Sequence, residues 1–479
     1  MEKLLFIAYN FPPVGGPGVP RNVNFVRHLP SFGFAPYVIA PENPSYYYRD
    51  DSDLAEIEKN AKISRTKIFE TLVFFKKLYF GLAGFLKKAG SEAAGGGAEN
   101  LVKPGETGGA AGKEKKETDL YATVIEGGKF FTSLKRAFRD IAFFPDDKNG
   151  WIYYVVKEAL RLIDGENIGL MHTTSFPYSA HLAGLIVKKL RPRVKWVADF
   201  RDPWSTVRRE YEPLKAFRKM AWLCEDLVLK NADAVTIVSE PWKEDFVKDH
   251  PKISGLGEKI KVITNGFERV DLKDGEIDPA KFSQILASGK LTVNFTGYFY
   301  AGLSDVFHVF LNAVSALVKK GLVDPGRIQI NLIGQKSDYS ERSISDADAG
   351  GYCKTWNYVP RRELEYIQRN STLLLLLTRH DVRGWHTSKL FEYLGAGRPI
   401  FAVCNSHDVA GELVRGLSAG SVIDAWDISR IEKEFLDIYR RFIKGEKIEV
   451  DSDKAGIEKF TRKNLTEQLA GVYRETLKR

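Results

Sequence analysis

The feature that most constrains the fold is a regular alternation of short apolar segments with segments of helical length. In the second half of the chain the apolar segments are residues 291–295, 328–333, 373–377, 399–403 and 421–423. In the first half they are residues 3–9, 34–40, 168–172, 194–198 and 234–239. Apolar runs of this length are typical of strands buried on both faces, and helices between them indicate parallel connections. The sequence therefore predicts an α/β fold with two Rossmann-like sheets.

Composition narrows the class of protein. A chain of 479 residues that is 44% hydrophobic and 28% charged is long enough for at least two cores. No uncharged apolar run approaches the roughly 20 residues of a membrane-spanning helix, and the N-terminal residues resemble a first strand rather than a leader. We therefore expect a cytoplasmic protein. The widely spaced Cys224, Cys353 and Cys404 indicate core thiols rather than a disulfide framework or metal cluster.

The charge of the chain favours an anionic partner. A net charge of +9 suits a sugar nucleotide, a phospholipid surface or a nucleic acid. Because the chain carries no nucleic-acid-binding motif, we expect no nucleic-acid partner.

Residues 385–400 carry the strongest chemical pattern. Thr387 and Ser388 are candidate N-caps of a helix that ends in a glycine-rich turn, and Lys389 and Glu392 lie on its first turn. Free N–H groups at a helix start and a lysine bind phosphate, and a carboxylate one turn later accepts hydrogen bonds from a ribose diol. The pattern predicts nucleotide-diphosphate recognition, although a capped amphipathic helix without a ligand has the same pattern.

Two loops of the first half add candidate residues. Gly15 and Gly16 follow the first strand, where a Rossmann-like sheet binds ligands, but no dinucleotide fingerprint is present. Asp199, Arg201 and Asp202 follow another strand and are costly to bury unless paired. They form either a functional cluster or an internal Arg–Asp salt bridge that shapes the loop.

These motifs together resemble family 4 glycosyltransferases. The run Lys-Leu-Phe-Glu-Tyr-Leu-Gly-Ala-Gly-Arg-Pro at residues 389–399 is similar to the donor-site motif of that family. Residues 199–204, Asp-Phe-Arg-Asp-Pro-Trp, are similar to a motif of one bacterial and archaeal branch. The resemblance implies a GT-B fold, in which two Rossmann-like domains face a cleft. We expect an N-terminal acceptor domain at 1–270, a donor domain at 271–452 and a terminal helix at 453–479 that crosses back to the first domain.

The resemblance also implies an activity. The chain would be a retaining glycosyltransferase that uses a UDP- or GDP-sugar and needs no metal or other cofactor. It would place Asp199, Arg201, Asp202 and His386 at the catalytic centre. The donor-binding residues would be Gly15, Gly16, Gly297, Tyr358, Val359, Thr387, Ser388, Lys389, Leu390 and Glu392.

The chain departs from the family at two places. The first of the family's paired glutamates falls at Gly384, and we consider His386 as its substitute, with a packing role as the alternative. The loop at 298–304 lacks the cations that relatives place on the diphosphate. Arg379, Arg383 or Arg201 are candidates to compensate, and backbone N–H groups with Lys389 are the alternative.

An insertion at residues 46–144 interrupts the alternation. Its middle, residues 89–118, has almost no large apolar side chain and is predicted to be disordered. Residues 69–88 and 130–144 form basic, aromatic amphipathic segments, which indicate either packing on the first domain or contact with a membrane. We therefore expect an acceptor presented at a membrane, such as a lipid-linked glycan intermediate, with membrane contact at the inner face of the plasma membrane.

Two other functions fit the sequence. GT-B sugar-nucleotide epimerases need carboxylate acid/base pairs, for which only Asp199 and Asp202 are available. A non-catalytic partner that binds sugar nucleotide or lipid would explain Gly384 and the missing cations.

Overall fold

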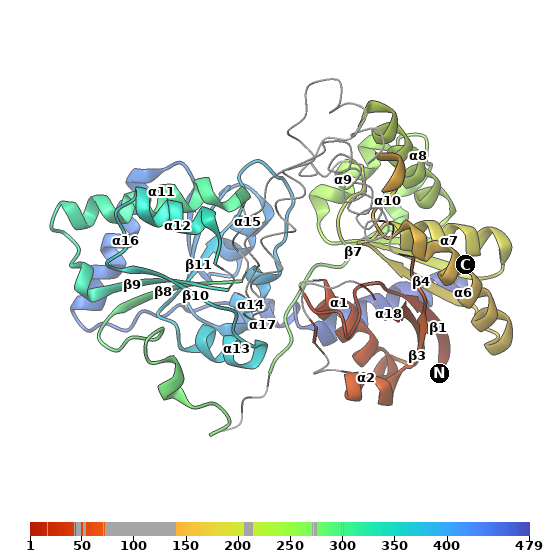
Figure 1. Cartoon of the computed structure of the whole chain (residues 1–479), viewed down its shortest axis with the longest axis horizontal. Helices are drawn as coiled ribbons and strands as arrows, with labels where there is room; N and C mark the ends of the chain where they lie inside the picture. Colours follow the sequence, from red (N-terminus) through yellow and green to blue (C-terminus); the bar gives the residue numbers. More distant parts are fainter. Residues whose placement is uncertain are drawn as a thin grey trace, which may run out of the picture. The chain divides into compact units, whose positions relative to one another are not determined.

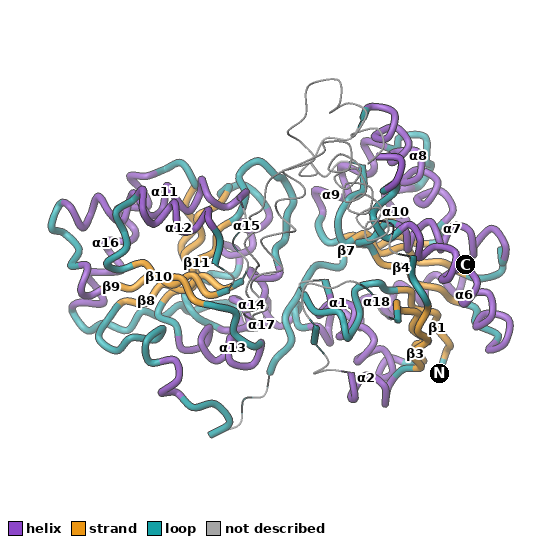
Figure 2. The backbone as a smooth tube through the Cα atoms, in the orientation of Figure 1, coloured by secondary structure: helices purple, strands orange, loops and turns teal. Residues whose placement is uncertain are grey.

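The computed structural model contains two compact units (Figures 1 and 2). The N-terminal unit comprises residues 2–15 and 35–235, and the C-terminal unit comprises residues 16–34 and 236–479 with Met1. The structure describes residues 1–16, 18–42, 44, 49–50, 54–69, 71, 140–205, 214–270, 272, 275–297, 299, 301–334 and 336–479. The predicted disordered segment 89–118 and most of the amphipathic segments 69–88 and 130–144 lie outside these residues.

Strands and helices alternate through the N-terminal unit. Its elements are β1 (Glu2–Ile7), β2 (Phe34–Pro41), α2 (Leu54–Asn60), β3 (Lys62–Thr66), α6 (Ile152–Glu166), β4 (Leu170–Thr174), α7 (Ser179–Leu190), β5 (Lys195–Phe200) and α8 (Lys215–Asn231). The strands belong to a seven-stranded sheet of order β3-β2-β1-β4-β5-β6-β7, completed by β6 (Ala234–Ile237) and β7 (Ile260–Val262). The order reverses between β1 and β4, and in such sheets ligands bind at the reversal.

The C-terminal unit is built around a six-stranded parallel sheet of order β10-β9-β8-β11-β12-β13, which reverses between β8 and β11. Its strands are β8 (Leu291–Thr296), β9 (Ile328–Ile333), β10 (Cys353–Trp356), β11 (Leu373–Leu377), β12 (Ile400–Cys404) and β13 (Gly420–Asp424). Its main helices are α11 (Ser304–Lys319), α12 (Asp338–Asp346), α13 (Arg361–Asn370), α14 (Ser388–Ala396), α15 (Val409–Gly416), α16 (Ile428–Ile443), α17 (Lys454–Glu458) and α18 (Arg462–Lys478). The unit also holds α1 (Val19–His28), α9 (Glu240–Asp249) and α10 (Leu256–Lys259).

The leucines of β11 show how the six-stranded sheet is buried on both faces. Leu373, Leu375 and Leu377 pack in the core formed with α11, α12 and α16. Leu374 and Leu376 pack in the core formed with α14 and α15. Successive side chains of a strand point to opposite faces, so an uninterrupted run of leucines is what a central strand between two helical layers requires.

Some predicted boundaries were wrong. Strand β5 continues to Phe200, so Asp199 lies inside the strand and pairs with Thr174. The predicted terminal helix is two helices, α17 and α18, because the backbone between them pairs with the chain at Phe267. The short strands β3 and β10 were not predicted, since they are edge strands with few apolar residues. None of the described helices is long and apolar enough to span a membrane.

The carboxylate of Asp146 binds the first residue of α7, Ser179, although the two residues are 33 positions apart in the sequence. Its buried carboxylate accepts hydrogen bonds from the backbone N–H of Ser179 at 2.8 Å, from the Ser179 hydroxyl at 2.7 Å and from the N–H of Lys148 at 3.0 Å. Burial nevertheless raises the pKa of Asp146 to about 6, because desolvation of the charge outweighs these bonds. The loop before α7 is therefore held by a group that titrates near neutral pH.

This raised pKa predicts a pH dependence of stability. The unfolded pKa of an aspartate is about 4. At a pH between the folded pKa of about 6 and the unfolded pKa of about 4, the folded state binds more protons than the unfolded state. The contribution of Asp146 to the free energy of unfolding therefore grows as the pH falls from about 6 toward about 4. Urea unfolding should show wild type gaining up to about 2–3 kcal/mol relative to Asp146→Asn over that range, at about 1.4 kcal/mol per pKa unit. Parallel pH curves for the two proteins would contradict the assignment.

Candidate functional site

Two glycines meet where β8 and β9 end, beside the point at which the sheet order reverses. The N–H of Gly297 donates to the carbonyl of Ile333 at 2.7 Å, and the N–H of Gly334 donates to the carbonyl of Trp356 at 3.1 Å. A Cβ atom at Gly334 would lie 2.4 Å from the carbonyl oxygen of Gly297. Side chains are therefore excluded at Gly334, at the edge of the sheet where folds of this kind bind ligands.

Lys389 lies directly against this glycine pair. A Cβ atom at Gly297 would lie 2.6 Å from Lys389 Cε, so the lysine occupies the space that a side chain would take. Its amine lies 5.2 Å from the ring centroid of Phe295. Burial lowers the pKa of Lys389, and the charge of Glu392 opposes that shift. The geometry places a partly desolvated cation at the carboxyl edge of the sheet.

Helix α14 carries Lys389 and is fastened to the end of β8. Thr387 is the N-cap, and its hydroxyl accepts from the N–H of Leu390 at 3.4 Å, while Ser388 is the first helical residue. The buried hydroxyl of Tyr393 accepts from the N–H of Thr296 at 2.9 Å. This bond fixes the helix one residue from Gly297, which explains how Lys389 is held in place.

The family's first glutamate has no room at position 384. Gly384 has φ +78°, and a Cβ atom there would lie 2.8 Å from Cδ1 of Trp242. The indole N–H of Trp242 donates to the carbonyl of Arg383 at 2.8 Å and so fixes this contact. The glycine at position 384 therefore has a steric reason, because an indole fills the space beside it.

Two arginines considered as substitute cations are already paired. Arg379 forms two hydrogen bonds with Asp381, at 2.9 and 2.8 Å. Arg383 contacts Glu244 at 2.5 Å and Asp245 at 3.2 Å. In this structure both guanidinium groups are neutralised by carboxylates, whereas Lys389 forms no ion pair with a carboxylate of the described residues. The alternative that rests on Lys389 and backbone N–H groups fits the geometry better.

A hydrogen bond to the backbone fixes the orientation of the His386 ring. Its Nδ1 lies 3.0 Å from the carbonyl oxygen of Val238, and its own carbonyl accepts from Asn265 Nδ2 at 3.0 Å. A carbonyl only accepts, so Nδ1 carries a proton, and in the neutral ring the lone pair is then on Nε2. Burial lowers the pKa of His386, and the ring also packs edge-on against Phe391 at 5.5 Å. The histidine therefore packs in a fixed orientation, and Nε2 of its neutral form is a hydrogen-bond acceptor.

Arg462, which the sequence analysis did not single out, lies in the electrostatic environment of Glu392. It is the first residue of α18 and is 4% exposed, and Nη1 has no hydrogen-bond partner among the described residues. Burial lowers the pKa of Arg462 to about 9, assisted by the charges of Arg21 and Arg361, while Glu392 opposes the shift. In the sequence Arg462 is one of many cations in a polar helix, so only the fold reveals its burial.

In the N-terminal unit, the predicted catalytic cluster is split between a strand and a loop. Asp199 is fully buried, and its carboxylate accepts from the Thr174 hydroxyl at 2.9 Å. Arg201 and Asp202 follow β5 and are partly buried, and within the described residues no ion pair joins Arg201 to Asp199 or Asp202. Asp199 is thus enclosed in the core of the unit, whereas the side chains of Arg201 and Asp202 are partly exposed to solvent.

A residue far along the chain holds the end of this loop. The buried carboxylate of Glu225, on α8, accepts from the N–H of Trp204 at 2.7 Å, from the N–H of Ser205 at 3.0 Å and from the Ser205 hydroxyl at 2.5 Å. Tyr178 stacks on Trp204 with ring centroids 4.9 Å apart and donates to the carbonyl of Pro203 at 2.9 Å. Nothing near Glu225 in the sequence indicates this role.

The remaining predicted donor residues lie in several places. Gly16 has φ +117°, and its carbonyl accepts from the N–H of Val19 at the start of α1, whereas Gly15 belongs to the N-terminal unit. Tyr358 is exposed and Val359 is partly buried, in the segment that follows β10. The side chain of Leu390 is buried in the core. Since its N–H donates to the Thr387 cap, Leu390 fixes the helix start and offers no side chain to a ligand.

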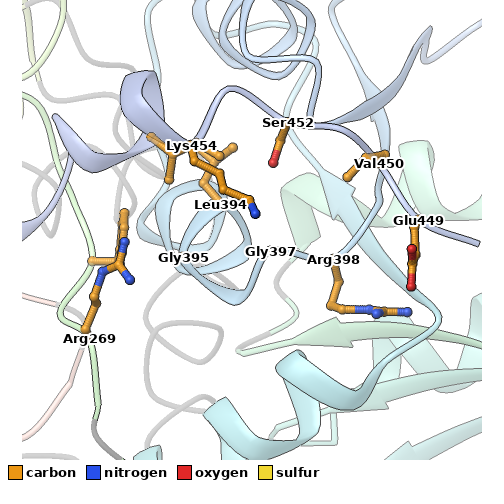
Figure 3. Close-up of a pocket in the computed structure, with 11 residues that line it drawn as sticks. Arg269, Leu394, Gly395, Gly397, Arg398, Glu449, Val450, Ser452 and Lys454 are labelled. Atoms are coloured by element: carbon orange, nitrogen blue, oxygen red, sulfur yellow. The ribbon is translucent and has the colours of Figure 1, made fainter.

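A cavity of about 350 Å³ lies at the opposite end of α14 from Lys389. It is lined by Gly395, Gly397, Arg398, Ser452 and Lys454, among others, and the side chain of Lys454 reaches toward Gly397 (Figure 3). None of the predicted donor-site residues lines it. The cavity is therefore separate from the candidate site.

Comparisons with known proteins give one family match and a set of similar folds. Residues 114–269 match the family model described as Glycosyltransferase Family 4. None of the curated proteins compared matches the chain. A glycosyltransferase structure from Rickettsia africae is 13% identical, with a TM-score of 0.59, and the match covers 100% of this chain and 99% of that one.

Two further structures are similar over their length. HepE from Anabaena, solved in complex with UDP and glucose, is 12% identical with a TM-score of 0.60, covering 99% of this chain and 100% of that one. Sucrose-phosphate synthase from Thermosynechococcus elongatus is 12% identical with a TM-score of 0.58, covering 99% of both chains. At these identities the likeness is one of fold, and the predicted α/β, GT-B-like fold is confirmed.

The contact between Gly297 and Lys389 gives a testable prediction. Gly297 has φ +109°, so Gly297→Ala should lower the free energy of unfolding by about 1–2 kcal/mol through backbone strain. The new methyl group should also displace Lys389 and weaken UDP binding by about tenfold, or about 1.4 kcal/mol. Urea unfolding and calorimetric titration with UDP measure the two effects.

Gly321→Ala is the matched control. Gly321 has φ +70°, and a Cβ atom there would meet nothing within 4 Å. It should therefore lose similar stability but keep wild-type affinity for UDP. Equal UDP affinities in the two variants would refute the role of Gly297.

Proposed function

We propose that the chain is a family 4 glycosyltransferase, which the match of residues 114–269 supports, and that it transfers a sugar from a UDP- or GDP-sugar to an acceptor with retention of configuration and without a metal. One observation carries the proposal. Lys389 lies over the bare backbone of Gly297 at the reversal point of the six-stranded sheet, beside the start of α14. A cation and free helical N–H groups at such a point suit a diphosphate.

Lys389 and the start of α14 would stabilise the departing nucleotide diphosphate. Negative charge develops on the phosphate oxygen as the bond to the sugar breaks, and a preorganised cation in a desolvated place stabilises that charge strongly. The bond between the anomeric carbon and the phosphate oxygen breaks while the acceptor oxygen bonds to the same face. The departing phosphate takes the acceptor proton, so no protein nucleophile is required.

Glu392 and His386 would orient the donor. Glu392 lies one turn after Lys389 on α14, and its carboxylate would accept hydrogen bonds from the ribose diol. The lone pair on His386 Nε2 would accept a hydroxyl of the transferred sugar, in place of the glutamate that Trp242 excludes from position 384. His386 would then act by positioning, since its neutral ring carries no charge to the reaction.

Arg201 and Asp202 are the proposed acceptor-side residues of the N-terminal unit. They follow β5 in a loop that Glu225 and the Tyr178–Trp204 stack hold in place. Asp199 is buried against Thr174 and would position this loop without touching substrate. A carboxylate and a guanidinium in a fixed loop suit the hydroxyl and phosphate groups of a lipid-linked glycan, which we propose as acceptor at the inner face of the plasma membrane.

Calorimetric titration with UDP and with GDP tests the donor site. Wild type should bind one of them saturably, and Lys389→Ala and Glu392→Ala should each weaken binding by about tenfold or more, about 1.4 kcal/mol. Lys454→Ala is the control, because Lys454 lies in the cavity at the other end of α14 and should leave affinity unchanged. A folded wild type that binds neither nucleotide would refute the proposed function and favour a non-catalytic role.

A further inference from the structure

The cavity at the C-terminal end of α14 has the size of a small-molecule site. Its volume of about 350 Å³ lies within the range of roughly 300–1,000 Å³ that is usual for ligand pockets. All of its lining residues belong to the C-terminal unit. Gly397, which lines it, has φ +67°, and a Cβ atom there would meet nothing within 4 Å. The space over the turn that ends α14 is therefore open.

Two cations of the cavity have no carboxylate partner. Arg398 is partly buried, and its Nε donates to the carbonyl of Ser371 at 2.7 Å, which fixes the position of the guanidinium group. Lys454 is exposed, and its side chain reaches toward the turn at Gly397 (Figure 3). Within the described parts of the chain, neither side chain forms an ion pair. The cavity thus offers one fixed and one adjustable cation to an anion.

The other polar side chains of the cavity suit a ligand with hydroxyl groups. Arg269 is paired with Glu458, so its charge is already neutralised. Glu449 also lines the cavity, and its exposed carboxylate repels an anionic group but accepts hydrogen bonds from hydroxyl groups. Ser452 adds a hydroxyl that both donates and accepts. An inorganic anion would use the two cations and leave these groups without a role.

Apolar side chains complete the lining. Phe267, Leu394 and Ile457 are 5%, 2% and 6% exposed, so the surface that they present to the cavity belongs to the core beneath it. Such a surface accommodates the carbon atoms of a small organic ligand. The lining therefore combines cations, hydroxyl-binding groups and an apolar floor within one unit.

We propose that this cavity binds the phosphate monoester of a small sugar or polyol. Lys454 and Arg398 would bind the phosphate oxygens, because cations that donate several hydrogen bonds bind phosphate strongly. Glu449 and Ser452 would bind the hydroxyl groups of the organic part. The inference does not rest on the proposed function, since none of the predicted donor-site residues lines the cavity. It assigns a second ligand to the helix whose first turn carries Lys389.

The test is calorimetric titration of the full chain with ribose 5-phosphate. Wild type should bind it saturably, at one site per chain. Inorganic phosphate and ribose should each bind at least about tenfold more weakly, because each satisfies only one part of the lining. Lys454→Ala should weaken binding of ribose 5-phosphate by about tenfold or more, since it removes one of the two unpaired cations.

Gly397→Asn tests the open space directly. Asparagine tolerates positive φ at the end of a helix, so the turn should be retained. Its side chain would enter the space over the turn and should weaken binding of ribose 5-phosphate by about tenfold. Wild-type affinity in this folded variant would contradict the proposed position of the ligand.

The controls separate this cavity from the donor site and from non-specific charge effects. Lys459→Ala removes an exposed lysine just after α17 that does not line the cavity, and it should keep wild-type affinity for ribose 5-phosphate. Lys389→Ala should keep it too, although that variant should lose UDP affinity. Saturating UDP should not displace ribose 5-phosphate from wild type, and displacement would assign this binding to the donor site.

The alternative is that Lys454 only offsets the negative end of the α14 dipole. In that case Lys454→Ala would lower the Tm and leave the affinity for ribose 5-phosphate unchanged. That result would overturn the proposal, as would the absence of saturable binding by folded wild type. Neither result bears on the proposed function, because UDP binding is measured separately.

Discussion

The backbone pairing at Phe267 connects the elements on which the candidate donor site depends. The N–H of Phe267 donates to the carbonyl of Phe460 at 3.1 Å, and its carbonyl accepts from the N–H of Arg462 at 2.8 Å. Its ring lies against α14, where a Cβ atom at Gly395 would come within 2.4 Å of ring atom Cδ2. One residue thus fixes the helix that carries Lys389 and Glu392 and the turn that buries Arg462. The break between α17 and α18 is a consequence, because those backbone groups are used outside the helix.

Charge at the candidate site is limited by the pairing of neighbouring residues. The segment before α14 contains Arg379 and Arg383, yet carboxylates hold both. Lys389 remains with a lowered pKa, which reflects the same desolvation that strengthens its interaction with an anion. Local pairing therefore leaves Lys389 without a carboxylate partner among the described residues while Arg379 and Arg383 are paired, and net charge by itself says little about a site.

The strands and the helix start were predictable because their signals are local. The leucines of β11 and the Thr387 cap act over a few residues, and the structure has both where the sequence predicts them. The same reasoning predicted that β5 ends at residue 198, whereas the strand continues to Phe200. The bond from Thr174 to Asp199 joins two strands, so a local signal does not contain it. Glu225, Trp242 and Arg462 were missed for the same reason. Each acts on residues far away in the chain, and neither periodicity nor composition records such contacts.

The contact between Trp242 and Gly384 also constrains how this chain can evolve. A glutamate at position 384 would need the space of the indole and a backbone conformation that side chains rarely adopt. Replacement of Gly384 alone is therefore unfavourable, and a smaller residue at position 242 alone would leave a void and lose the bond to Arg383. The two positions are therefore coupled, and a glutamate at position 384 would require a second substitution at position 242.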